Sequence, residues 1–191
     1  MNIEHIDFDD LQTSAVSQPV IKHMYIADPS AHVFDGQIYI YTSHDIDAGI
    51  PFTDLGDHFS MEDYHVISME SPDREAIDNG VALHVKDMPW AERQMWAPDA
   101  AYKDGKDFLF FPAKKANDIF QIGVAVSDSP VGPFIPEAVP INGSYSIDPA
   151  VFEDDNGDYY LITEISYDAE GKKKSIDPYG KTNTDHQQLL K

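Results

Sequence analysis

The sequence predicts an all-β protein built as part of a β-propeller, with about three blades present. Three observations lead to this prediction. A strand–turn–strand unit occurs three times, each copy contains an acidic turn ending in glycine, and the copies follow one another at blade-like intervals. Apolar residues make up 42% of the 191 residues and aromatic residues 12%, which is enough to form a hydrophobic core.

The three copies share one pattern of residue types. Each has a proline, a short apolar run, an acidic turn with a glycine, and then an aromatic-rich run. Because Asp-Gly and Asn-Gly supply the left-handed positions of tight turns, each copy is predicted to form a β-hairpin. The copies span residues 28–41, 97–111 and 148–162, with their turn glycines at Gly36, Gly105 and Gly157.

The spacing of the turn glycines predicts the blade organisation. They lie 69 and 52 residues apart, whereas a four-stranded blade needs about 40–50 residues. We therefore expect an insertion in the first interval, over the Asp- and Gly-rich residues 45–63. Residues 119–127 are expected to form a further strand, and 129–134 the turn and edge after it. A β-sandwich with similar hairpins remains an alternative on the pattern alone.

The two ends of the chain differ from its centre. Residues 1–18 are interpreted as an N-terminal arm, 19–165 as the propeller domain and 166–191 as a polar, disordered tail with a basic cluster at 172–174. The first residues are acidic and lack an apolar segment, so we expect no signal peptide and a cytoplasmic location. No apolar run approaches the length that spans a membrane.

The charge of the chain limits its partners. With 13 basic and 34 acidic residues the net charge is -21, which disfavours nucleic acid and anionic membranes and leaves neutral ligands such as sugars. Without cysteine, disulfides and thiolate metal sites are impossible. The eight histidines show no metal-ligand spacing, and the acidic run 154–158 is interpreted as a turn, so no metal and no cofactor is predicted.

Five motifs follow one another along residues 19–162, at 27–30 with 39–45, 80–84, 95–99, 122–127 with 132–134, and 146–152. Together they resemble glycoside hydrolase family 43, which contains β-xylosidases, α-L-arabinofuranosidases and arabinanases. The resemblance implies a five-bladed propeller, an inverting mechanism and a substrate pocket at one mouth of the central channel. It also implies that a channel calcium ion is possible in the full-length fold.

Two aspartates are the candidate catalytic residues. Asp28 begins the first copy of the repeat and Asp148 occupies the matching position in the third. Inverting hydrolysis needs two carboxyl groups about 6.5–9.5 Å apart. By resemblance, Asp28 is the general base, and Asp148 orients the general acid and raises its pKa. The alternative is that each Asp-Pro pair simply begins a strand.

Other residues near these motifs are candidates for substrate binding. Trp96 is expected to form either an apolar wall for a sugar ring or part of the core, and Ile147 precedes Asp148. Phe111 and His44 end hairpin strands and are expected to face the pocket. Asp99 replaces the motif aspartate in the second copy, one residue after the proline, and is interpreted as a structural residue that binds backbone amides.

The chain departs from the family pattern after Leu161. The family's general acid is a glutamate on a later blade, usually followed by Gly-Pro, whereas Glu170-Gly171 is followed by Lys172 and is not accepted as that acid. We expect a glycosidase acting on pentose-containing oligosaccharides from xylan or arabinan, as a β-xylosidase or an α-L-arabinofuranosidase. The truncated chain alone is expected to be weakly active or inactive. The alternatives are a non-catalytic sugar-binding remnant and, more remotely, a propeller interaction module.

Overall fold

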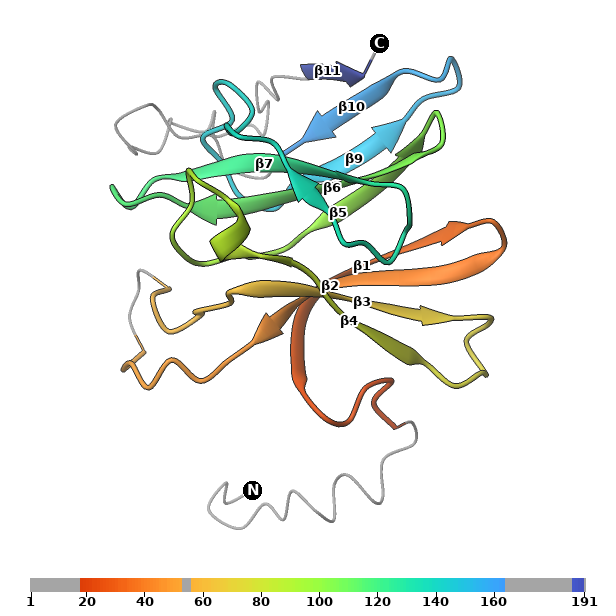
Figure 1. Ribbon diagram of the computed structural model, residues 1–191, viewed down its shortest axis with the longest axis horizontal. Helices are drawn as coiled ribbons and strands as arrows, with labels where there is room; N and C mark the ends of the chain where they lie inside the picture. The colour runs from red at the N-terminus through yellow and green to blue at the C-terminus, as the bar shows by residue number, and fades with distance from the viewer. Residues whose placement is uncertain (1–17, 53–55, 164–186, 191) are drawn as a thin grey trace, which may run out of the picture.

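The computed structural model describes residues 18–52, 56–163 and 187–190, the last four by their backbone alone. These residues form three antiparallel sheets and one short 3-10 helix, and the described part of the chain contains no α-helix (Figure 1). The prediction of an all-β protein is confirmed. The described residues include no helix whose length and apolar character would let it cross a membrane.

The first sheet is a four-stranded meander in which each strand pairs with the next along the chain. Asp35 and Gly36 form its first hairpin turn with φ angles of 50° and 79°, as the Asp-Gly pair predicts. The predicted insertion leaves at the end of the second strand and returns at the start of the third. The strands are β1 (Tyr25–Phe34), β2 (Gln37–Asp45), β3 (Asp63–Met69) and β4 (Ile77–His84).

The second sheet repeats this meander after a 3-10 helix, η2 (Val85–Asp87). The strand predicted over 119–127 is β7, and the short edge strand β8 follows the predicted turn. Asp104 and Gly105 form the first hairpin turn with φ angles of 51° and 80°. The strands are β5 (Asp99–Lys103), β6 (Lys106–Lys114), β7 (Phe120–Ser127) and β8 (Ile135–Pro136).

The third sheet has three strands, β9 (Ala150–Glu153), β10 (Tyr159–Ile162) and β11 (Gln187–Leu190), with β10 between the other two. Residues 187–190, which belong to the predicted disordered tail, form the strand β11. Their backbone pairs with β10, which has a free edge on that side to accept a strand. The remainder of the predicted tail, 166–186 and 191, and the arm over 1–17 lie outside the described residues.

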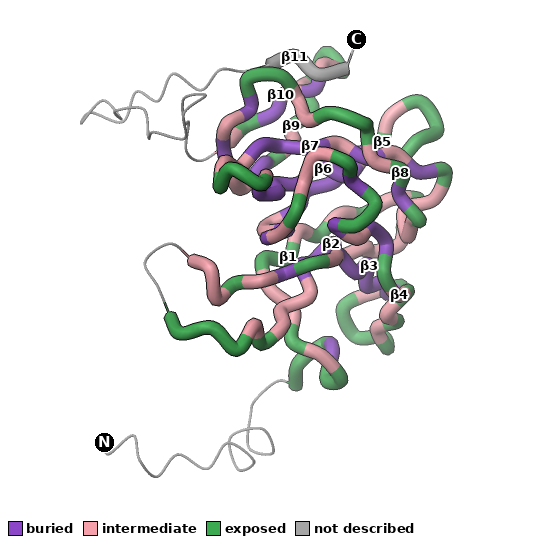
Figure 2. Tube along the Cα trace, turned by 60° about the vertical axis from the view of Figure 1, so that its left-hand side comes forward, coloured by how far each residue is buried: buried purple, intermediate pink, exposed green. Residues whose placement is uncertain are grey.

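The sheets pack face to face, and the alternation of side chains along β6 shows how. Leu109, Phe111 and Ala113 point into the core shared with the first sheet, whereas Phe108 and Phe110 point into the core shared with the third. A strand that is covered on both faces needs apolar residues at every position, which explains the near-continuous apolar run there. Figure 2 shows buried residues along β6 and β7 of the middle sheet and along β2 and β3 of the first sheet.

The stacking of three successive meanders distinguishes this fold from a two-layered sandwich. Each sheet is complete before the chain enters the next, as in the blades of a propeller. The first strand of each blade lies beside its counterpart in the next blade, since β1 contacts β5 and β5 contacts β9. The residues that begin these three strands are thereby brought to one place.

Candidate active site

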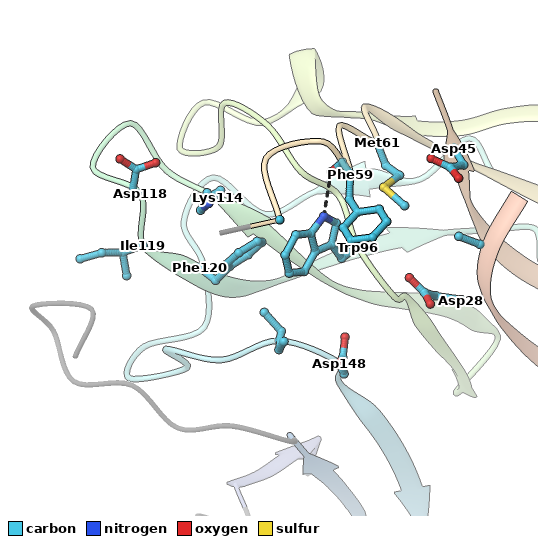
Figure 3. A pocket seen from close by; sticks show the side chains of 13 residues that line it. Asp28, Asp45, Phe59, Met61, Trp96, Lys114, Asp118, Ile119, Phe120 and Asp148 are labelled. Atoms are coloured by element: carbon cyan, nitrogen blue, oxygen red, sulfur yellow. Dashed lines mark hydrogen bonds between the residues drawn. The ribbon is translucent and has the colours of Figure 1, made fainter. Parts of the chain in front are cut away.

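An open pocket of about 590 Å³ lies where the three blades meet. In Figure 3, Asp28 and Asp45 lie at one end of the pocket and Lys114 and Asp118 at the other, with aromatic rings between them. The first, second and third blades and the insertion all contribute to its lining. The pocket therefore depends on the packing of the blades, and no blade forms it alone.

The two candidate catalytic aspartates both line this pocket. Asp28 lies in β1, and Asp148 precedes β9 by two residues. Both have a φ angle of 50°, which costs about 1–2 kcal/mol for a residue with a side chain. Both also precede a proline, which normally holds the preceding residue in an extended conformation. The repeat therefore preserves the same unfavourable backbone at both acids, as is common at functional sites.

The backbone around Asp28 explains how its side chain reaches the pocket. The pairing of β1 with β2 shifts register between Ala27 and Ser30, which is a bulge in an otherwise regular hairpin. Such an irregularity turns one side chain away from the alternating pattern of the strand. The carboxylate of Asp28 is thereby directed towards the pocket, as is that of Asp148 (Figure 3).

The pKa shifts of the pocket residues indicate that Asp28 and Asp148 lie close to one another. Partial desolvation raises the pKa of Asp28, and the carboxylate of Asp45 raises it further. Burial raises the pKa of Tyr64 well above its ordinary value, and the carboxylates of Asp28 and Asp148 both add to that rise. Both acids therefore lie near the Tyr64 hydroxyl, which donates a hydrogen bond to the carbonyl of Trp96 at 2.6 Å.

Three aromatic rings form the wall between the two ends of the pocket. The ring centroid of Trp96 lies 4.5 Å from that of Phe120 and 6.4 Å from that of Phe59. The indole Nε1 of Trp96 donates a hydrogen bond to the carbonyl of Phe59 at 2.9 Å (Figure 3). At Gly56 a Cβ atom would lie 2.9 Å from the indole, so the insertion approaches Trp96 closely only because this residue is glycine.

Lys114 provides a positive charge at the far end of the pocket, and the sequence motifs did not indicate it. Its Nζ lies 5.1 Å from the centroid of the Phe120 ring and 3.7 Å from Oδ1 of Asp57, and the residue is only 6% exposed. The predicted hairpin ended at Phe111, whereas β6 continues to Lys114. Continuing the predicted strand beyond Phe111 could have identified Lys114 as a residue of β6.

The structure brings four of the six predicted site residues together and separates two. Trp96 and Ile147 line the pocket with Asp28 and Asp148. Phe111 does not, and the expectation that it faces the pocket is wrong.

Phe111 is fully buried, with its ring stacked 6.2 Å from that of Trp90, because the alternation along β6 directs it into the core. His44 is not among the pocket residues either, because neighbouring residues of β2 point to opposite faces and it is Asp45 that lines the pocket. The Nδ1 of His44 lies 3.1 Å from Oδ1 of Asp63.

Asp99 links the three blades beside the pocket. Its Oδ1 accepts a hydrogen bond from Ser30 at 2.5 Å and lies 2.7 Å from Nε2 of His32, while its Oδ2 accepts one from the backbone N–H of Val151 at 2.6 Å. Burial alone would raise the pKa of Asp99, but these hydrogen bonds lower it below its ordinary value. Asp99 binds a backbone amide, as its interpretation as a structural residue requires.

The described residues do not provide a site for the channel calcium ion that the resemblance makes possible in the full-length fold. Calcium takes six to eight oxygen ligands. Within the described residues, one group of three His, Asp or Glu side chains lies close enough to share an ion, and two of its three members are histidines. The carboxylates of the pocket form no such group. No step of the chemistry is therefore assigned to calcium.

Comparison with known proteins agrees with this architecture. The family model for glycosyl hydrolases family 43 matches residues 16–185. Xylosidase/arabinosidase 43A of Humicola insolens is 59% identical over 145 residues, which are 75% of this chain and 44% of that protein. The xylosidase/arabinosidase of Bacteroides ovatus is 59% identical over 138 residues, which are 72% of this chain and 42% of that protein.

Solved structures show the same relation. The β-xylosidase/α-arabinofuranosidase CoXyl43 from a compost metagenome, in complex with xylotriose and calcium-free, is 67% identical with a TM-score of 0.75, over 78% of this chain and 45% of that one. The GH43_1 enzyme of Xanthomonas citri, also complexed with xylotriose, is 55% identical with a TM-score of 0.73, over 85% of this chain and 46% of that one.

The chain thus spans less than half the length of the relatives that it matches. These structures are five-bladed β-propellers, and the three sheets described above correspond to some of their blades. The predicted fold class, a partial five-bladed propeller, is confirmed. The matched family model, the identities and the shared fold establish that the chain belongs to glycosyl hydrolases family 43.

Proposed function

We propose that this chain forms the part of a glycosidase that holds the catalytic base, and that the enzyme hydrolyses glycosidic bonds in pentose-containing oligosaccharides with inversion. The observation that carries the proposal is the pair Asp28 and Asp148. They occupy matching positions of a repeat, share a left-handed backbone and line one pocket. Two aspartates that merely began strands would have no reason to share this strained conformation.

In the proposed reaction Asp28 takes a proton from a water molecule, which attacks the anomeric carbon as the bond to the leaving oxygen breaks. A separate carboxylic acid protonates that oxygen. The raised pKa of Asp28 suits a general base, because a base with a pKa closer to the working pH accepts a proton more readily. Asp148 is assigned to the orientation of the acid, and no described residue is assigned as the acid itself.

The wall of the pocket supports a sugar as the ligand. Trp96, Phe120 and Phe59 offer apolar faces beside the carboxylates, and Lys114 with Asp118 offers polar groups at the far end. Sugars are recognised by this combination, since their C–H faces pack on aromatic rings and their hydroxyls bind polar groups. Complexes of CoXyl43 and of the Xanthomonas citri enzyme with xylotriose favour xylo-oligosaccharides as the first substrates to test.

The catalytic part of the proposal can be tested with a chimera. Residues 18–163 would be joined to the part of the Humicola insolens relative that this chain does not match. Hydrolysis of xylotriose by this chimera would be monitored by NMR of the released sugar. We expect a product of inverted anomeric configuration. Asp28→Asn should lower kcat/KM by about 10²–10⁴-fold. A retained configuration, or undiminished hydrolysis by Asp28→Asn, would contradict the proposal.

Binding by the 191-residue chain alone separates the enzyme part from the alternative of a non-catalytic remnant. Isothermal titration with xylotriose should show weaker binding after Trp96→Ala, because the aromatic wall is lost, and unchanged binding after Tyr102→Ala, whose side chain is exposed and does not line the pocket. If this chain binds xylotriose but the chimera does not hydrolyse it, the results would favour the alternative of a sugar-binding remnant.

A further inference from the structure

Three potential metal ligands come together on one face of the first blade. They are His44 at the end of β2, and Asp63 and His65 at the start of β3. One ligand atom from each lies within 4.8 Å of the other two. Their side chains are partly buried, with exposed fractions of 31%, 15% and 11% respectively. None of the three lines the pocket of the candidate active site.

The pairing of the two strands explains why these side chains meet. Asp63 and His65 are two residues apart on β3, so they point to the same face of the sheet. Thr42 pairs with His65 and Ser43 with Tyr64, so the antiparallel register brings His44 opposite Asp63. The cluster therefore spans two strands, which is why the spacing of histidines along the sequence did not indicate it.

The distances between the ligand atoms are short enough for one small cation to bridge them. Nδ1 of His44 lies 3.1 Å from Oδ1 of Asp63, and Nε2 of His65 lies 3.6 Å from the same oxygen. Around a tetrahedral zinc ion with bonds of about 2.0–2.1 Å, neighbouring ligand atoms lie about 3.4 Å apart. The existing distances fall on either side of this value, so small side-chain rotations would complete the geometry.

A fourth residue orients one of the ligands. Nδ1 of His65 lies 2.8 Å from Oδ1 of Asp78, which leaves Nε2 of the same ring facing Asp63. Oδ1 of Asp78 also accepts a hydrogen bond from the backbone N–H of Gly80 at 2.9 Å, which holds the carboxylate in place. A carboxylate behind a ligating histidine fixes the ring and its tautomer in most metal sites and strengthens its basicity.

We propose that His44, Asp63 and His65 form a binding site for a divalent transition metal ion, with zinc as the expected ion. Two imidazole nitrogens and one carboxylate oxygen favour zinc over calcium or magnesium, which prefer oxygen ligands. A water molecule would complete the coordination. The site lies outside the active-site pocket, and its three ligands take no part in the proposed chemical step.

The position of the site indicates what the ion does. The insertion between β2 and β3 leaves one residue after His44 and returns at Asp63, so an ion bound there joins its two ends. The same insertion supplies Gly56, Phe59 and Met61 to the pocket. The ion would therefore cross-link the two ends of the insertion and restrict the movement of the pocket wall that the insertion forms.

Zinc titration of the 191-residue chain tests the proposal. After treatment with a chelator and removal of the chelator, isothermal titration with zinc chloride should show one saturable site per chain. His44→Gln should weaken zinc binding at least about 10-fold by removing a ligand, and Asp78→Asn by about 10–100-fold by releasing the His65 ring. His84→Gln is the matched control, because this histidine lies in the same blade outside the cluster, and its zinc affinity should equal that of the unsubstituted chain.

Cobalt provides a second measurement that does not depend on the folding of a variant. Cobalt(II) bound to two nitrogens and one oxygen in a four-coordinate site should give intense visible absorption bands, which one equivalent of zinc removes. Absence of saturable zinc binding, absence of these bands, or equal zinc affinity in His44→Gln and the unsubstituted chain would each overturn the proposal. Tighter binding of calcium than of zinc would overturn it as well.

Discussion

Asp28 and Asp148 share one unusual backbone angle, which supports the proposal that both residues act in catalysis. Among the described residues, six non-glycine residues have a positive φ angle. Three of the six, Asp35, Asp104 and Asp118, lie in turns or bends, where such angles are expected. The two aspartates instead adopt the same left-handed angle directly before a proline. The sequence indicated their importance through matching positions in a repeat, but the shared conformation required the structure.

The titration of Asp28 gives a prediction for stability. Its pKa is raised in the folded state, so its ionised form is disfavoured there. The stability that Asp28 contributes is therefore complete below its unfolded pKa of about 3.9 and is lost as the pH rises through the folded pKa. At pH 7, Asp28→Asn should make the 191-residue chain more stable, because it removes the disfavoured charge and keeps the shape.

Urea unfolding at pH 7 and at pH 3.5 measures this effect. The advantage of Asp28→Asn should be clear at pH 7 and should shrink at pH 3.5, where Asp28 is largely protonated in both states. Asp104→Asn, at an exposed turn position with a similar φ angle, is the control and should show a smaller effect. A loss of stability in Asp28→Asn at pH 7 would show that the carboxylate is stabilising.

At the level of elements, hairpins were predictable and blade ends were not. The turns at Gly36 and Gly105 were found because Asp-Gly determines a tight turn from two residues alone. The end of β6 at Lys114 was missed, because the strand end depends on its pairing with β7. The placement of Phe111 failed for a related reason, since its face is decided by which sheet packs on each side of β6.

The interior position of Gly123 leads to a prediction for β7. Gly123 pairs with Phe111 across the strands, and the rings of Phe111 and Trp90 cover its backbone. A Cβ atom there would lie 2.6 Å from the Phe111 ring and 2.7 Å from the Trp90 ring. Gly123→Ala should therefore lower the free energy of unfolding by about 1–3 kcal/mol, because a core this tightly packed cannot accept an added methyl group.

A double variant distinguishes this steric cause from a general intolerance of alanine in β7. Phe111→Leu frees space at the same point, so the variant that carries both substitutions should lose less stability than the sum of the two single losses. Urea unfolding of the three variants gives the coupling energy. Additive losses would mean that the Phe111 ring does not restrict residue 123.

At the scale of the whole molecule, apolar layers and the buried carboxylate of Asp99 hold the described blades together. The layers on the two faces of β6 join each blade to the next. Their composition could be predicted from the apolar runs, and so could the number of blades from the repeat. The way in which Asp99 reaches the first and third blades could not, because it depends on three strands that are distant in the sequence.

Asp99 should therefore be important for the stability of the described blades as a unit. It is 5% exposed and accepts hydrogen bonds from Ser30 in the first blade and Val151 in the third. Hydrogen bonds to a charged group contribute about 1.5–3 kcal/mol, and an amide cannot accept from every donor present. Asp99→Asn should thus lower the free energy of unfolding by about 2–3 kcal/mol at pH 7.

The pH dependence of this loss tests its electrostatic origin. Because the folded-state pKa of Asp99 is lowered, its stabilisation is present above the unfolded pKa of about 3.9 and is lost as the pH falls through the folded pKa. In urea unfolding, the deficit of Asp99→Asn should be complete at pH 7 and diminish below pH 4, whereas Asp104→Asn should match the unsubstituted chain. An equal deficit at both pH values would assign the role of Asp99 to packing, because the charge would then contribute nothing to the joining of the blades.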